Sequence, residues 1–302
     1  MNRLTTLVIA ELAVPVAPRV AAYAAAIAAR HPSANAVLFY GSCLREARLD
    51  GLMLDFYLIV DDYDAAYDGG WRARANRALP PNVFQVAHDG LRAKYAVLDS
   101  ADFARLASRT TANPSVWARF AQPSRLAWVR DDAARDAAVA AVAGAAPALL
   151  AACAPMLDRE LSVADLWTGA FALTFAAELR TERAGRGQGI VAADPARYAA
   201  FTAPALSAAG IAATVDGDRV RIDTGGNRAA AMRAWAARRR TGKALSLARL
   251  AKAAFTYNGG LDYLAWKIER HAGVPVRPWM RRWPVLGGLV LLPRLVRLGA
   301  VR

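Results

Sequence analysis

VLFYGSCLREARLDGLMLDFYLIV, residues 37–60, is the segment around which the chain is organised. It predicts an apolar strand up to Tyr40, then Gly41-Ser42, a basic segment, and a second apolar strand that carries one acid, Asp55. Gly41 would let the backbone approach a phosphate group, to which the Ser42 hydroxyl and local N–H groups would donate hydrogen bonds. The Asp55 carboxylate would hold Mg²⁺ against the same phosphates. The stretch therefore predicts a site for a phosphate-bearing ligand and its metal ion.

A Gly-Ser pair at a strand end, with an acid inside the next strand, is typical of a nucleotidyltransferase palm. The alternative is an ordinary strand–turn–strand in which Gly41 serves the turn and Asp55 lies at a strand edge. Two more short strands are predicted over residues 83–87 and 94–98. Lys94, at the entry to the last strand, either contacts a phosphate or is a solvent-exposed lysine.

The chain has 302 residues and a net charge of +14, enough length for two domains and a strong bias toward an anionic partner. That partner would be a nucleotide, a nucleic acid or an acidic membrane surface. The hydrophobic fraction of 56% is high, yet no apolar run is expected to reach the ~18 residues that span a bilayer. Cys43 and Cys153 are far apart in the sequence and are predicted to be buried or incidental thiols in a reducing compartment. With no evident secretory signal, these features predict a cytoplasmic protein.

Ala-rich helices are predicted over residues 17–30 and 133–157, and residues 115–132 are also predicted to be helical. Arg119 lies among aromatic residues in this last segment. An arginine in apolar surroundings needs a partner, which would be a phosphate or an acid such as Asp131 or Asp132 in a salt bridge.

The second half begins with an amphipathic helix that is predicted to end at residues 184–185. Arg180, Arg183 and Arg186 gather near that end, either as a phosphate clamp or because cations suit a helix C-terminus. A hairpin is predicted to turn at residues 216–217, followed by a basic helix. Helix, hairpin and helix in this order are compatible with a winged-helix-like module.

The C-terminal stretch 277–302 contains Trp279 and Trp283 around two arginines, then a short apolar run and further arginines. The apolar run is too short to cross a bilayer. Tryptophan and arginine beside an apolar tip favour a peripheral membrane anchor. The alternative is a C-terminal helix that packs on the protein core.

Five motifs, in the same order along the chain, resemble the mitochondrial translocator assembly and maintenance family of phosphatidate cytidylyltransferases and its bacterial relatives. The resemblance covers roughly residues 36–191 and is weaker toward the C-terminus. The motifs are FYGSCLR, LDFYLIV, KYAVLD, WARFAQPSRL and ELRTERAGRGQGIV.

The resemblance implies an α+β chain with a polymerase-β-like nucleotidyltransferase palm over residues 1–130. A mostly helical, winged-helix-like domain would follow over residues 131–270, and a basic apolar membrane-association segment over residues 271–302. The implied enzyme depends on Mg²⁺, takes CTP and phosphatidate, and releases CDP-diacylglycerol and pyrophosphate. It would work peripherally on the inner face of the cell membrane.

Asp55 is expected to hold the metal and, with Lys94, to be catalytic. The residues expected to bind the nucleotide are Gly41, Ser42, Arg119, Arg180 and Arg186. The chain also departs from the pattern, because many nucleotidyltransferases have a second acid where this chain has Met53, and Asp50 is the nearest substitute. The family's histidine-containing segment has no clear counterpart. These departures leave two other functions open: nucleotide transfer to RNA or protein, and non-catalytic binding of lipid or nucleic acid.

Overall fold

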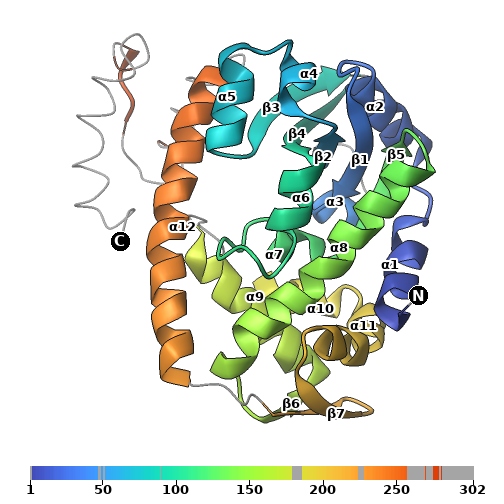
Figure 1. The fold of residues 1–302 in the computed structure, drawn as a ribbon, viewed down its shortest axis with the longest axis vertical. Coiled ribbons are helices and arrows are strands. Elements are labelled where there is room, and N and C mark those ends of the chain that lie inside the picture. Colours follow the sequence, from blue (N-terminus) through green and yellow to red (C-terminus); the bar gives the residue numbers. More distant parts are fainter. Residues whose placement is uncertain are drawn as a thin grey trace.

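The computed structural model describes residues 2–46, 49, 52–88, 90–178, 186–223, 228–256, 269, 275–278 and 280. Within these ranges the protein is α+β, as predicted (Figure 1). Its larger sheet is five-stranded and mixed, in the order β3-β4-β2-β1-β5. The strands are β1 (Ala34–Tyr40), β2 (Met53–Val60), β3 (Asn82–His88), β4 (Leu91–Asp99) and β5 (Ser124–Val129).

The four strands predicted from the sequence are confirmed, and their pairing sets the geometry of the sheet. β1 pairs antiparallel with β2 and with β5, and β3 pairs antiparallel with β4. β2 and β4 are parallel neighbours, so a crossover separates them in sequence. Gly41 ends β1, and the short helix α3 (Ser42–Glu46) follows it directly.

Alternating side chains of the sheet enter two separate cores, as the two-residue period of a strand requires. Phe39, Phe56 and Val97 are buried on one face, which is covered by helices α2 (Pro18–Ala28), α4 (Tyr63–Tyr67) and α5 (Gly70–Ala78). Leu38 and Tyr57 are buried on the other face. That face is covered by α1 (Arg3–Leu12), α6 (Ser100–Leu106), α7 (Trp117–Phe120) and α8 (Asp132–Cys153).

The second half of the chain adds helices and a small antiparallel sheet of order β6-β8-β7. The predicted hairpin and the basic helix after it are both confirmed, whereas α9 ends at Ala177, before the predicted end at 184–185. Figure 1 shows the long basic helix, α12, along one side of the molecule. The elements are a 3-10 turn (Ala154–Met156), β6 (Glu160–Ser162), α9 (Val163–Ala177), α10 (Arg186–Ala192), α11 (Pro195–Ala208), β7 (Ala212–Asp216), β8 (Arg219–Asp223) and α12 (Arg228–Thr256).

The prediction of a continuous helix over 115–132 is wrong. The helix α7 lasts for four residues, and the chain then enters β5, which forms the edge of the sheet beside β1. Leu126 packs toward one core and Trp128 toward the other. The strand forms because its backbone pairs with β1, an interaction that helical spacing in the sequence does not reveal.

The core on the α8 side is continuous across residue 130, where the sequence suggested a domain boundary. Leu38 of β1, Trp117 of α7, Trp167 of α9 and Trp235 of α12 all belong to this one cluster of buried side chains. The part that contains the five-stranded sheet and the helical part that follows it are therefore packed against each other through shared apolar contacts.

One helix of the described chain, Asp132–Met156, is long and apolar enough to cross a membrane by length and composition. The expectation that no segment reaches this length is therefore wrong. In the structure, 67% of its most apolar window is buried inside the protein, as in the core helix of a soluble domain. Most of the predicted C-terminal anchor, residues 277–302, lies outside the described residues.

Several acids have structural roles. Asp62 is the N-cap of α4, and Asp99 is the N-cap of α6, where it accepts a hydrogen bond from the Asp102 amide at 2.7 Å. Asp61 pairs with Arg130 at 2.7 Å. Cys43 and Cys153 are buried free thiols, as predicted.

Candidate functional site

The candidate site begins with one row of residues across the sheet. Tyr40 of β1 is the direct neighbour of Asp55 on β2, and Asp55 is the direct neighbour of Lys94 on β4. Directly opposed residues of adjacent strands point to the same face of a sheet, so the three side chains lie together. The Lys94 Nζ atom is 3.0 Å from Asp55 Oδ1. The Asp55 side chain is 18% exposed and that of Lys94 is 43% exposed, so this ion pair faces the solvent at its lysine end.

Gly41 lies against the carboxylate of Asp55. Its φ is +98°, a conformation that side-chain-bearing residues rarely adopt. A Cβ atom at this position would be 2.9 Å from Asp55 Oδ2 and 3.3 Å from Asp55 Cβ. The backbone that links β1 to α3 therefore passes directly over the Asp55 side chain. Ser42 follows at the start of α3 and is half-buried.

Arg119 is held beneath the same face by α7. Its Nη1 atom donates to Glu178 Oε1 at 3.3 Å and also to the carbonyl oxygen of Ser115. Burial acts to lower the pKa of Arg119, but the charges of Glu178 and, more weakly, Asp55 outweigh it and leave this pKa above its usual value. The sequence correctly indicated that this arginine needs a partner. The suggested partners Asp131 and Asp132 are wrong, and Glu178 takes that place.

Two further basic residues, Arg249 and Lys252, reach this region from α12. Arg249 donates from Nε to the carbonyl of Pro80 at 2.8 Å and from Nη1 to Ser115 Oγ at 3.2 Å. Lys252 donates to the carbonyls of Leu79 and Pro81, the latter at 2.9 Å. The C-terminal half of α12 is thus fastened to the segment that enters β3.

Burial lowers the pKa values of both α12 residues. Burial is the largest cause of the lowered pKa of Arg249, and the positive charge of Arg119 lowers it further. Tyr57 and Glu178 act in the opposite direction and raise this pKa. For Lys252, burial and then the charge of Arg249 lower the pKa to about 7. The charge of this helix was evident in the sequence, but neither residue was predicted to belong to the site. The sequence offered one signal for them: α12 contains no acidic residue, and Arg249 and Lys252 lie about one turn apart on it.

The named groups form one electropositive neighbourhood. It contains four basic residues (Lys94, Arg119, Arg249 and Lys252) and two carboxylates (Asp55 and Glu178). The charge of Glu178 raises the pKa values of both Arg119 and Arg249, and the charge of Asp55 also raises that of Arg119. The charge of Arg119 lowers the pKa of Arg249. An excess of cations in partly buried surroundings favours the binding of a polyanion.

Arg180 lies outside the described residues. Arg186 begins α10, but its side chain is also outside them. Their predicted role in a phosphate clamp thus stays a prediction.

The donor set at Asp55 limits how a metal ion could bind. In the described part of the chain, no group of three or more His, Cys, Asp or Glu side chains is arranged to hold a metal ion. Asp55 contributes one carboxylate next to Lys94, and the position two residues earlier on β2 is Met53. Mg²⁺ in nucleotide sites is commonly held by one or two carboxylates, with substrate phosphates and water as the other ligands. Asp55 therefore fits Mg²⁺ only as a single protein ligand, with the other ligands coming from outside the protein.

No protein-family model matches the chain, and no curated protein matches it. The resemblance to phosphatidate cytidylyltransferases therefore stays a prediction from the five motifs. The geometry around Asp55 is the observation on which a functional proposal has to rest.

Proposed function

We propose that the protein is a phosphatidate cytidylyltransferase, which makes CDP-diacylglycerol and pyrophosphate from CTP and phosphatidate. The single observation that carries the proposal is the meeting of Gly41, Asp55 and Lys94 at one point of the sheet. Gly41-Ser42, the acid of the second strand and the lysine of the β4 strand are separate motifs in the sequence. Their convergence is what a polymerase-β-like palm requires. The helix α11, the β7–β8 hairpin and α12 support a winged-helix-like second part.

In the proposed reaction, a phosphate oxygen of phosphatidate attacks the α-phosphorus of CTP. A new P–O bond forms while the bond between the α-phosphorus and the bridging oxygen breaks, and pyrophosphate leaves with that oxygen. Mg²⁺, when bound, would neutralise charge on the phosphate oxygens.

The chain's own residues have distinct tasks in this reaction. The backbone at Gly41 and the Ser42 hydroxyl would bind the triphosphate close to Asp55. Lys94 orients the Asp55 carboxylate and, being 43% exposed, can also reach a phosphate oxygen. Arg119 and Arg249 add fixed positive charge where the transition state gains negative charge. The protein would act peripherally on the cytoplasmic face of the membrane, where phosphatidate is an anionic lipid.

The decisive experiment measures pyrophosphate release from each common nucleoside triphosphate with Mg²⁺, in the presence and absence of phosphatidate vesicles. Release that needs both CTP and phosphatidate is expected from the wild type. Asp55→Asn should abolish it, because the neutral amide loses the charge that faces the metal and Lys94. Asp136→Asn, at an exposed position of α8, is the matched control and should retain full activity. Normal binding of CTP without any phosphatidate-dependent release would refute the proposal.

A second candidate is non-catalytic binding of a polyanion. It is favoured by the single carboxylate at the site and by its ion pair with Lys94, since many nucleotidyltransferases carry two acids on this strand. In that case the protein would bind nucleotide or anionic lipid equally well with Mg²⁺ or with EDTA, and Asp55→Asn would strengthen binding of the anion.

A further inference from the structure

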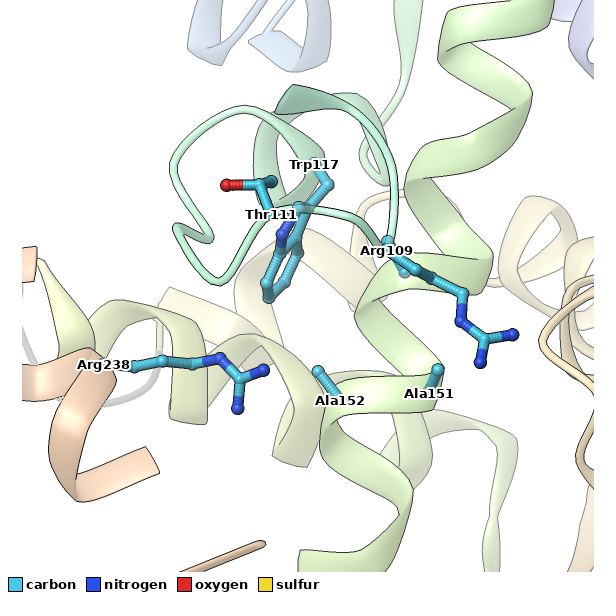
Figure 2. Close-up of a pocket in the computed structure, with 7 residues that line it drawn as sticks. Arg109, Thr111, Trp117, Ala151, Ala152 and Arg238 are labelled. Atoms are coloured by element: carbon cyan, nitrogen blue, oxygen red, sulfur yellow. The ribbon is translucent and has the colours of Figure 1, made fainter. Parts of the chain in front are cut away.

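A basic pocket lies away from Asp55, between α8, α12 and the segment that leads into α7 (Figure 2). Its volume is about 190 Å³. Arg238, which lines it, is eleven residues before Arg249 on α12, so the two arginines are about 16 Å apart along the helix axis. The lining residues are Arg109, Thr111, Trp117, Ala148, Ala151, Ala152 and Arg238.

The two arginines come from different elements and are held in place through backbone carbonyls. Arg238 donates from Nε to the carbonyl of Ala112 at 3.2 Å, and its guanidinium carbon is 5.0 Å from the centre of the Trp235 ring. Arg109 donates from Nη1 to the carbonyl of Ala209 at 2.9 Å. Figure 2 shows the two guanidinium groups on opposite sides of the alanines of α8. Both side chains are therefore fixed without using all of their donors.

No carboxylate neutralises either arginine within the described residues. None of the described ion pairs includes Arg109 or Arg238, and the pocket lining contains no acidic residue. Burial lowers the pKa of Arg238, and the Cys153 thiol opposes this effect weakly. Two guanidinium groups that share a pocket without a counter-charge repel each other, and a bound anion would relieve that repulsion.

The remaining polar side chains of the lining differ in their direction. Figure 2 shows the Thr111 hydroxyl directed away from Trp117 and the two arginines, and its oxygen accepts a hydrogen bond from the Asn113 amide at 3.2 Å. Trp117 contributes an indole N–H, which can only donate. Ala148, Ala151 and Ala152 give the α8 side an apolar surface without acceptor side chains. Donors suited to an oxyanion thus come from Arg109, Arg238 and Trp117, with small apolar residues between them.

We infer that this pocket is a binding site for a phosphate group. A tetrahedral phosphate offers several acceptor oxygens to donors that converge from different directions, and arginine is the side chain that best matches it. The volume of about 190 Å³ is smaller than the range of roughly 300–1,000 Å³ typical of sites for larger ligands. It therefore suits a single phosphate, carried by a soluble phosphomonoester or by a lipid headgroup. This inference does not depend on the reaction proposed for Asp55.

Binding here would also connect the two functional regions of the molecule. The pocket joins α12, through Arg238, to the segment that carries Thr111 and Trp117. That same segment continues to Ser115, which accepts from Arg249, and to Arg119 beside Asp55. A phosphate that bridges Arg109 and Arg238 would hold α12 against this segment.

The test is calorimetric titration of the full-length protein with inorganic phosphate and with glycerol 3-phosphate. Phosphatidylcholine vesicles with and without phosphatidate form a parallel series. Arg238→Gln and Arg109→Gln are each expected to weaken binding about tenfold, because each removes charge-assisted hydrogen bonds to the phosphate. Arg233→Gln is the matched control, since Arg233 is an exposed arginine of the same helix and does not line the pocket.

Loss of Arg238 also removes its contacts with Ala112 and Trp235, so a second variant separates binding from folding. Ala151→Glu places a carboxylate between the two arginines and leaves both in place, and it should abolish phosphate binding. Ala140→Glu, at an exposed position of α8, should have no effect.

Binding of the soluble phosphates with this variant pattern would support a site for a free phosphomonoester. The same pattern with phosphatidate vesicles alone would support a site for a lipid headgroup. Absence of binding in both series, or binding that Arg238→Gln and Ala151→Glu leave unchanged, would overturn the inference.

Discussion

Gly41→Ala is the sharpest perturbation of the candidate site, because it adds one methyl group at the point where the backbone crosses Asp55. The new Cβ atom would be 2.9 Å from Asp55 Oδ2, inside the distance that real Cβ contacts show. Alanine at a φ of +98° costs about 1–2 kcal/mol in backbone strain. Moving the Asp55 carboxylate away weakens its pair with Lys94, which adds up to about 1 kcal/mol for a partly exposed pair. The close contact itself adds about 1 kcal/mol as nearby groups shift.

The free energy of unfolding of Gly41→Ala should therefore fall by about 2–4 kcal/mol, as measured by urea denaturation. Gly210→Ala is the control, since Gly210 also has a positive φ of +71°, but no atom lies within 4 Å of the position that its Cβ would take. It should show the backbone strain alone, about 1–2 kcal/mol. Equal losses for the two variants, together with unchanged ligand binding by Gly41→Ala, would refute the close approach of Gly41 to Asp55.

Two further predictions concern buried charges. Glu11→Gln should lower the free energy of unfolding by about 3–5 kcal/mol, because it leaves the buried Arg197 without its carboxylate partner. The control is Glu160→Gln, which breaks the exposed pair of Glu160 with Arg221 and should cost under about 1 kcal/mol. A similar small loss for both would contradict the buried pair. Lys252 has a pKa of about 7 in the folded protein, below its usual value of 10.5. Between these pH values the unfolded chain binds more protons than the folded protein, so the free energy of unfolding should rise as the pH increases from about 7 to 10. Denaturation across this range should show a flatter dependence for Lys252→Met, and an unchanged slope would contradict the assignment.

Local sequence patterns were sufficient for most elements of the fold. The apolar runs of β1 and β2 and the alanine-rich stretches of α2 and α8 are properties of neighbouring residues, and the structure confirms each of these elements. The hairpin of β7 and β8 was predicted from Asp216-Gly217, because few residues other than glycine favour the positive φ of +56° found at Gly217.

β5 and the partners of Arg119 could not be predicted in this way. Residues 124–129 have aromatic and basic neighbours at helical spacing, and they become a strand only because β1 offers an unpaired edge. Glu178 is 59 residues from Arg119 in the sequence, and Arg249 is 169 residues from the Pro80 carbonyl that it contacts. No periodicity links positions so far apart.

Residue types and short spacings were enough to identify the groups of the candidate site: a glycine, a carboxylate in an apolar strand, and an excess of arginine and lysine. These features depend on residue type and on spacing over a few positions, which can be read from the chain directly. Only the folded chain shows that β2 and β4 are parallel neighbours in the register that sets Asp55 opposite Lys94. It also shows that α12 brings Arg249 and Lys252 to the segment before β3. Strand order and helix docking are selected by the burial of apolar surface over the whole chain, so they follow from packing rather than from any local motif.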